Sequence, residues 1–349
     1  MMDGLHIGDC RDILPTLPER SVHCCITSPP YFGLRDYGVD GQIGLEPSPD
    51  AFVAAMVQVF REVRRVLRDD GTLWLNLGDS YATSGGQSPQ SGPLFKGRNR
   101  QRENISISQR IVAAGMKSKD LCGIPWLVAL ALRADGWYLR QDIIWHKPNP
   151  MPESVRDRCT KAHEYLFLLS KSPIYYFDAE AIAEPLAAST IDRLAQQNLA
   201  NQRGSDRVPG KTNGAMKAVG PRFGGSKYGD DARDEARTKS GNEWSGADSG
   251  LRNKRSVWSV ATQPFPDAHF ATFPQALIEP CVLAGAPPGG TVLDPFLGAG
   301  TTAVVCERLG RRWIGCELNT EYADIAKRRI ESTQPGLPLA LPKQEAAHG

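Results

Sequence analysis

The sequence predicts an α/β fold in which a mostly parallel sheet carries helices on both faces. Two observations predict it. Short apolar strands alternate with amphipathic helices along much of the chain. Several of these strands end in glycine, proline or acidic residues, at the carboxyl edge where open sheets of this kind bind ligands. With 349 residues, of which 41% are hydrophobic, the chain has room for one large domain and an insertion.

The composition excludes several classes of protein. The formal net charge is only +2, so any face that binds nucleic acid must come from local clusters of charge. No apolar run reaches membrane-spanning length and residues 1–4 lack the pattern of a signal peptide, so we expect a cytoplasmic protein. The eight cysteines are scattered without a Cys-x-x-Cys pair. This usage indicates reduced thiols, with neither disulfides nor a metal site.

The N-terminal residues supply the first strands of the predicted sheet. A strand over residues 5–10 ends in the turn Gly8-Asp9, and a short helical turn follows it. Residues 22–27 form an apolar strand of the buried type and run straight into Ser28-Pro29-Pro30-Tyr31. Two prolines cannot continue a central strand, so the chain must stop there, at the ligand-binding edge of the sheet.

The middle of the chain continues the alternation. Apolar side chains recur on one helical face of residues 52–67, and residues 72–77 form the next strand, with Gly78-Asp79-Ser80-Tyr81 at its tip. A helix over 123–133 then precedes a strand over 137–145.

Two further apolar segments follow. The segments 163–170 and 174–177 are separated by the tight turn Lys171-Ser172-Pro173. This spacing predicts an antiparallel hairpin at one edge of the sheet.

The C-terminal part holds a strand, a glycine turn and a helix start, from Val292 to Thr302. Gly298 and Gly300 let a ligand approach the backbone, and the helix start behind them offers free N–H groups. A second strand ends in Glu317, about twenty residues past the turn, where an acid suits the hydroxyl pair of a ribose. The pattern therefore predicts a ligand that contains adenosine.

The other side chains of this turn narrow the choice of ligand. The turn lacks both the third glycine of a dinucleotide site and the Lys-Ser/Thr pair of a triphosphate site. It opens with Asp294 and Phe296, which we expect to face the pocket. An acid suits a cationic ligand, so S-adenosylmethionine, with its sulfonium and amino groups, fits better than NAD or ATP.

Two polar segments interrupt the ordered pattern. In residues 82–120, seven Lys and Arg oppose two acidic residues, as in a mobile loop or a loop that contacts phosphates. From about 180 to 256 the hydrophobic periodicity fades, which indicates a linker or an inserted recognition region. The candidate DNA contacts of the two segments are Arg98, Arg100, Arg102, Arg222, Lys227, Arg252, Lys254 and Arg255.

Two of these motifs resemble those of DNA amino-methyltransferases. Residues 26–31 resemble the catalytic motif of that family, and residues 294–302 resemble its S-adenosylmethionine motif. The catalytic motif comes first, as in the permuted beta group of these enzymes. The resemblance implies a Rossmann-like, S-adenosylmethionine-dependent methyltransferase fold with circularly permuted motif order. It also implies four regions: a catalytic half at 1–179, a target-recognition region at 180–256, a cofactor-binding half at 257–333 and a loose tail at 334–349.

The resemblance assigns roles to particular residues. It implies that the Ser28 hydroxyl and the Pro29 carbonyl accept hydrogen bonds from the amino group of a flipped-out base, while Pro30 stiffens the turn and Tyr31 stacks on the base. Cys281 sits in a helical pattern and is interpreted as a core residue. The implied cofactor contacts are Asp9, Phe273, Asp294, Phe296, Gly298, Gly300, Thr301, Thr302, Glu317 and Asn319.

The choice of base remains open between two amino groups. Members of the family with serine before Pro-Pro are mostly cytosine-N4 enzymes, so the resemblance favours cytosine N4 over adenine N6. A methyltransferase acting on RNA or on a small molecule and a catalytically silent nucleic-acid binder remain as alternatives. The implied partner is double-stranded DNA, a cognate restriction endonuclease is a further candidate, and the chain is a monomer or a homodimer.

Overall fold

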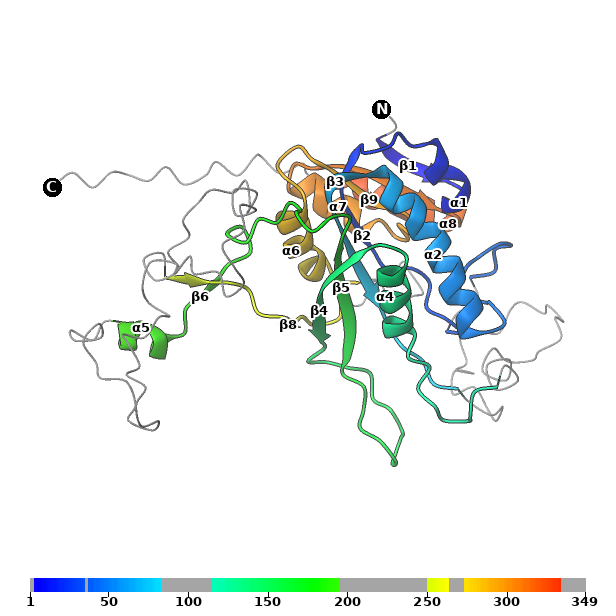
Figure 1. The fold of residues 1–349 in the computed structure, drawn as a ribbon, viewed down its shortest axis with the longest axis horizontal. Helices are drawn as coiled ribbons and strands as arrows, with labels where there is room; N and C mark the ends of the chain where they lie inside the picture. The colour runs from blue at the N-terminus through cyan, green and yellow to red at the C-terminus, as the bar shows by residue number, and fades with distance from the viewer. Residues whose placement is uncertain (1–2, 35–36, 83–114, 195–249, 264–272, 334–349) are drawn as a thin grey trace. The chain divides into compact units, whose positions relative to one another are not determined.

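The structure is a computed structural model that describes residues 3–34, 37–82, 115–194, 250–263 and 273–333. The chain divides into two compact units, one made of Met1–Tyr176 with Ser256–Gly349 and the other of Phe177–Arg255. The second unit can be compared with the recognition region that the sequence predicts at 180–256. Figure 1 shows the order of the elements along the chain.

The first unit is built on one eight-stranded sheet, in the order β1-β10-β9-β2-β3-β5-β4-β8. Seven of the strands run parallel, and β5 alone runs against its two neighbours. The mostly parallel sheet predicted from the sequence is therefore confirmed. The bounds of its strands are β1 Gly4–Ile7, β2 Val22–Thr27, β3 Leu67–Leu77, β4 Tyr138–His146, β5 His163–Ser170, β8 Val257–Ser259, β9 Thr291–Asp294 and β10 Arg312–Glu317.

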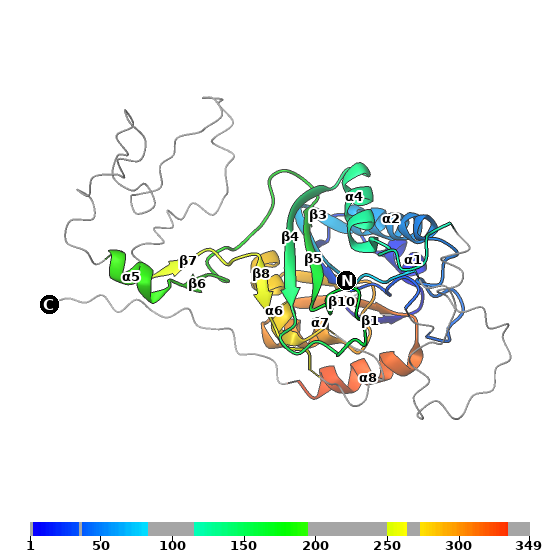
Figure 2. The same ribbon diagram turned by 90° about the horizontal axis from the view of Figure 1, so that it is seen from below.

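Helices cover both faces of this sheet. Figure 2 shows α1, α2 and α4 on one side of the strands and α6, α7 and α8 on the other. The fold is therefore doubly wound, with helices on both faces of the sheet, as in nucleotide-binding α/β folds. The helices are α1 Cys10–Ile13, the 3-10 turn η1 Leu14–Thr16, α2 Pro49–Val66, α4 Ile124–Ala134, α6 Gln275–Gly285, α7 Thr301–Arg308 and α8 Thr320–Glu331.

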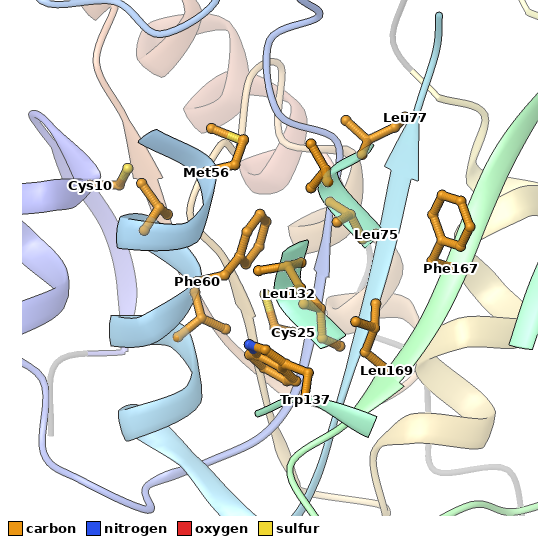
Figure 3. Packing of buried hydrophobic residues seen from close by; sticks show 14 of the residues in the cluster. Cys10, Cys25, Met56, Phe60, Leu75, Leu77, Leu132, Trp137, Phe167 and Leu169 are labelled. Carbon is orange, nitrogen blue, oxygen red and sulfur yellow. The ribbon is translucent and has the colours of Figure 1, made fainter. Parts of the chain in front are cut away.

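The largest core lies between β3, β5 and the helices α2 and α4. One apolar face of α2 recurs at helical spacing and is buried, and Ser48 caps the helix by accepting the Ala51 N–H. In Figure 3, Phe60 of α2 and Leu132 of α4 point towards Leu75 of β3. These contacts hold strands β2 and β3 against the helices of this face.

The opposite face packs more closely because of one glycine. An added Cβ on Gly285 of α6 would lie 2.6 Å from the Cys24 Sγ of β2 and 2.8 Å from the Trp74 Nε1 of β3. Only a residue without a side chain lets α6 lie this close to the two strands. Cys281 is buried on the same helix, in agreement with the core role predicted for it.

The antiparallel hairpin that the sequence predicts is formed by other strands, since β5 pairs with β4, which precedes it, and not with residues 174–177. Residues 174–177 form no strand, and β5 pairs instead with β3 on one side and β4 on the other. Both edges of β5 are therefore occupied, so no edge remains for a following strand. The Tyr176 N–H donates instead to the Asp70 carbonyl of β3 at 2.8 Å.

The second unit contains few regular elements among its described residues, 177–194 and 250–255. Strands β6 Glu184–Pro185 and β7 Leu251–Arg252 pair antiparallel, and helix α5 spans Ala188–Leu194. The pairing of β6 with β7 brings the start and the end of this unit together.

Candidate functional site

The candidate site lies at the carboxyl edge of the sheet, where the chain switches direction between β2 and β9. These strands pair in parallel, yet β2 leads into α2 on one face and β9 leads into α7 on the other. The loops that follow them therefore diverge at the kind of position where open α/β sheets bind ligands. The two predicted motifs follow these two strands.

Ser28 is oriented by a neighbouring strand. The Ser28 hydroxyl is half-buried and donates to the Asn76 Oδ1 of β3 at 3.2 Å. The Asn76 Nδ2 donates to the Tyr165 carbonyl at 3.0 Å, which fixes the amide with its oxygen towards Ser28. Because its proton is engaged by Asn76, the Ser28 hydroxyl is left with lone pairs that can accept hydrogen bonds.

Tyr31 is anchored at both ends of its ring. Its hydroxyl donates to the Glu164 Oε2 at 2.6 Å, and its ring lies so close to Gly78 that an added Cβ there would be 2.4 Å from Tyr31 Cε2. Burial, reinforced by the charge of Glu164, raises the pKa of Tyr31 well above its ordinary value. The Tyr31 ring, which is predicted to stack on a base, is therefore held in one position close to Ser28.

Charged groups beside Tyr31 complete this half of the site. Lys147, just after β4, pairs with the Glu164 Oε1. Asp79 accepts the Gly123 and Ile124 N–H groups at the start of α4, both at 3.1 Å, while burial raises its pKa. Burial lowers the pKa of Lys161, whose ammonium lies 3.4 Å from the Asp79 carbonyl oxygen. The catalytic edge is therefore polar but largely shielded from water.

Asp294 differs from its predicted orientation, because its carboxylate does not face the ligand edge. The side chain is 1% exposed and accepts from the Thr27 hydroxyl at 2.6 Å and from the Thr302 hydroxyl at 2.7 Å. A third bond comes from the Phe296 N–H at 3.1 Å. Burial raises the pKa of Asp294 to about 6. The carboxylate thus ties β2, β9 and α7 together beneath the turn.

Glu317 lies at the tip of β10, beside the tip of β1. Its Oε2 accepts the Gly298 N–H and its Oε1 accepts the Asn319 N–H, both at 2.8 Å. Burial raises its pKa. The acid and the glycine turn predicted to hold an adenosine ligand are therefore in direct contact.

Asp9 follows β1 at the same edge. Although its burial opposes ionisation, hydrogen bonds and charge from Arg11 outweigh that effect and lower the pKa of Asp9. Arg11 also donates to the Gly41 carbonyl at 2.7 Å. The predicted contact Asp9 is thus an ionised carboxylate held by its neighbour.

The glycine turn is supported from behind by α8. Gly298 and Gly300 have φ angles of 56° and 81°, which favour glycine. An added Cβ on Gly300 would lie 3.0 Å from the Ala326 Cβ, whereas one on Gly298 would meet only the Phe296 carbonyl oxygen, at 4.0 Å. The backbone at Gly298 is therefore open to a ligand, and that at Gly300 is filled by α8.

Other predicted cofactor residues lie around this turn. Thr301 and Thr302 are buried in the first turn of α7, and Arg329 donates to the Ala299 carbonyl and to the Thr301 hydroxyl. Asn319 caps α8 by accepting the Glu321 N–H at 2.8 Å. Phe296 is half-buried against the main core, and Phe273 is half-buried just before α6.

Most of the predicted DNA contacts cannot be compared with the structure. Arg98, Arg100, Arg102, Arg222 and Lys227 lie outside the described residues.

The remaining three predicted contacts lie around one acid of the second unit. Arg252, Lys254 and Arg255 lie 3.6, 3.5 and 3.4 Å from the carboxylate of Glu184. Three positive side chains thus gather around one acid.

Sequence reasoning missed three polar residues of the site. Asn76 and Glu164 contact Ser28 or Tyr31, and Thr27 binds Asp294. A signal for the first two exists, since Asn76 interrupts the apolar end of β3 and Glu164 stands just before the apolar run of β5. Such residues at a ligand edge need hydrogen-bond partners, and here the partners are the catalytic turn.

This arrangement defines a class of protein: an α/β enzyme with an adenosine-ligand edge beside a turn of hydrogen-bond acceptors. The family model N6_N4_Mtase, described as DNA methylase, matches residues 22–328. The chain belongs to this family of DNA amino-methyltransferases, as the resemblance predicts.

Curated relatives agree with this assignment. The chain is 43% identical over 325 residues to the Type II methyltransferase M.SmaI of Serratia marcescens, covering 93% of this chain and 89% of M.SmaI. It is equally similar to the Type II methyltransferase M.Cfr9I of Citrobacter freundii, at 43% over 325 residues, with 93% and 86% covered. Both similarities span nearly the whole chain.

Solved structures share the fold. TTHA0409 of Thermus thermophilus, solved in complex with S-adenosyl-L-methionine, matches with a TM-score of 0.53 and 23% identity, over 96% of each chain. PvuII DNA methyltransferase matches with a TM-score of 0.56 and 17% identity, over 93% of this chain and 85% of its own. The Rossmann-like fold is thus confirmed.

S-adenosylmethionine is the cofactor of this family, and the residues present fit it. The Glu317 carboxylate suits a hydroxyl pair, and the open backbone at Gly298 gives the ligand room. Among the described residues no cluster of acids, His and Cys could hold a metal ion, and no helix is both long and apolar enough to span a membrane.

Proposed function

We propose that this chain methylates the N4 amino group of cytosine at specific sites in double-stranded DNA. The observation that carries the proposal is the hydrogen bond from Ser28 to Asn76, which turns the serine hydroxyl into an acceptor. An exocyclic amino group is a poor nucleophile because its lone pair is delocalised into the ring. Acceptors for its N–H groups draw the nitrogen towards tetrahedral geometry.

The chain's own residues would prepare the amine. Ser28 Oγ and the Pro29 carbonyl accept its two N–H groups, and the two prolines hold these acceptors before the base arrives. Tyr31 limits where the base can lie, since its ring is fixed by Glu164 and Gly78. S-adenosylmethionine, when bound, supplies the methyl group. The acceptors then align the amine for in-line transfer, and the product amine loses its proton to water.

The half-buried position of Ser28 favours a flipped-out base. An amino group inside a duplex cannot reach a turn at a shielded sheet edge, so the target nucleotide must leave the stack. The choice of cytosine rests on the family resemblance of a serine before Pro-Pro. The description of PvuII methyltransferase as cytosine-N4-specific is in line with it.

Recognition is proposed to lie in the second unit, 177–255. Its described residues Arg252, Lys254 and Arg255 are candidates for phosphate contacts, together with Arg98, Arg100, Arg102, Arg222 and Lys227 outside the described residues. The names of the curated relatives, Type II methyltransferases, support a cognate restriction endonuclease as partner. We place the enzyme in the cytoplasm, with its DNA.

Mass spectrometry of nucleosides tests this function. DNA is incubated with labelled S-adenosylmethionine and either the natural chain or a Ser28→Ala variant. We expect labelled N4-methylcytosine from the natural chain and about 100-fold less from the variant, with cofactor binding retained, because one preorganised hydrogen-bond partner is lost. Labelled N6-methyladenine would overturn the choice of cytosine. Label in RNA, with none in DNA, would overturn the DNA substrate.

A further inference from the structure

An ion pair lies beside the catalytic turn. The Lys147 ammonium contacts the Glu164 Oε1, and the side chains are only 19% and 14% exposed. The ammonium also lies 4.4 Å from the ring centre of Trp145. Removing two charges from water has a desolvation cost that can equal or exceed the gain from their attraction. A contribution to fold stability alone therefore does not explain why this ion pair is present.

The second carboxylate oxygen points at the catalytic machinery. Glu164 Oε2 accepts the Tyr31 hydroxyl at 2.6 Å and lies 3.4 Å from the Asn76 Nδ2. Both partners adjoin Ser28, because the Asn76 Oδ1 accepts the Ser28 hydroxyl and lies 3.1 Å from the Tyr31 hydroxyl oxygen. One carboxylate is thus connected to the serine through both Tyr31 and Asn76.

The topology explains why these groups meet. Strands β2, β3 and β4 run parallel, so Ser28, the end of β3 and Lys147 all lie at the carboxyl edge. Strand β5 runs the other way, so Glu164 near its start reaches the same edge. The single antiparallel strand of the described sheet therefore delivers one acid to the site.

We propose that Glu164 is a positioning residue for methyl transfer, acting through Tyr31. By holding the Tyr31 hydroxyl, it keeps the ring against Gly78 and the Asn76 amide turned towards Ser28. Lys147 fixes the carboxylate in this place. The inference rests on the proposed role of the Ser28–Tyr31 turn.

The Glu164→Gln variant isolates this role. Tyr31 and Lys147 both donate to the carboxylate, one to each oxygen. Glutamine offers one acceptor oxygen, so its amide nitrogen must either face the Lys147 ammonium and break that bond, or donate to the Tyr31 oxygen and reverse the direction of that hydrogen bond. We expect the single-turnover methylation rate to fall about 10- to 100-fold, the size expected for a displaced reacting geometry. The KM for DNA and the cofactor Kd should stay within about threefold of the natural chain.

Two further variants make the test specific. Glu62→Gln is the matched control, since it removes a partly exposed ion pair with Arg65 on α2, away from the catalytic edge. It should leave the methylation rate unchanged. Tyr31→Phe removes only the hydroxyl and should reproduce the loss seen in Glu164→Gln. In the Tyr31→Phe background, Glu164→Gln should then cause no further loss of rate.

The outcomes separate this inference from the proposed function. A Glu164→Gln chain with the natural rate, or one with only a lower melting temperature, would overturn the positioning role. Losses that multiply in the double variant would overturn action through Tyr31. A natural chain that labels no base in DNA would overturn the proposed function.

Discussion

The contact between Tyr31 and Gly78 gives a prediction whose size follows from the structure. In a Gly78→Ala chain, the new Cβ would lie 2.4, 2.8 and 3.1 Å from three carbons of the Tyr31 ring. Carbon atoms in contact are normally about 3.5–4.0 Å apart, so the ring must move by roughly 1 Å. The φ angle of Gly78 lies outside the left-handed region, so alanine adds no backbone strain.

The displaced ring should slow methyl transfer more than it destabilises the fold. A shift of about 1 Å in a residue that aligns reactants costs up to about 100-fold in rate. Overpacking costs about 1–3 kcal/mol in the free energy of unfolding. We would measure single-turnover transfer of labelled methyl to DNA, alongside unfolding in urea.

A Tyr31→Ala background tests whether the displaced ring causes the loss of rate. In a Tyr31→Ala chain the ring is absent, so adding Gly78→Ala should not slow methylation further. If Gly78→Ala alone kept the natural rate and stability, the position of the ring against Gly78 would be refuted.

Two predictions concern the cofactor half. A Glu317→Gln chain has one acceptor oxygen for two backbone N–H groups, so cofactor affinity measured by calorimetry should fall about 10- to 100-fold, and an unchanged Kd would contradict the assigned edge. Burial raises the Asp294 pKa from 3.8 to about 6, so its protonated form stabilises the fold below about pH 4, and this stabilisation is lost as the pH rises through 6. An Asp294→Asn chain lacks that loss, so its unfolding free energy relative to the natural chain should rise by about 2 kcal/mol from pH 4 to pH 7, and a constant difference would argue against a buried titrating acid.

Local patterns predicted much of the fold because the strands and helices are marked within short windows. The amphipathic spacing of α2 and the glycine turn after β9 are properties of neighbouring residues. The predicted helices and most strands therefore agree with the structure. Residues 174–177 do not pair with β5 because β4, the strand before it in sequence, and β3 already occupy both of its edges.

Some site residues could likewise be predicted from their neighbours in sequence, whereas others depend on contacts with distant parts of the chain. Strand ends are local, so Ser28 and Glu317 could be predicted at the ligand edge. Asp294 sits at a strand end too, yet its carboxylate turns to the hydroxyls of Thr27 and Thr302, one of them on a strand 267 residues earlier. The contact of Asp294 with Thr27 could be predicted only once β2 and β9 were known to be neighbouring strands.

This difference changes how the acid of the cofactor motif is interpreted. A carboxylate exposed in the pocket would act by attracting a cationic ligand, and its removal would weaken binding directly. A carboxylate with three internal donors instead holds the turn after β9 against the strand that carries Ser28, since Thr27 immediately precedes that serine. Asp294 therefore connects the cofactor motif to the catalytic motif through these hydrogen bonds. Its replacement should disturb the alignment of the cofactor edge with the catalytic turn as well as the stability of the fold.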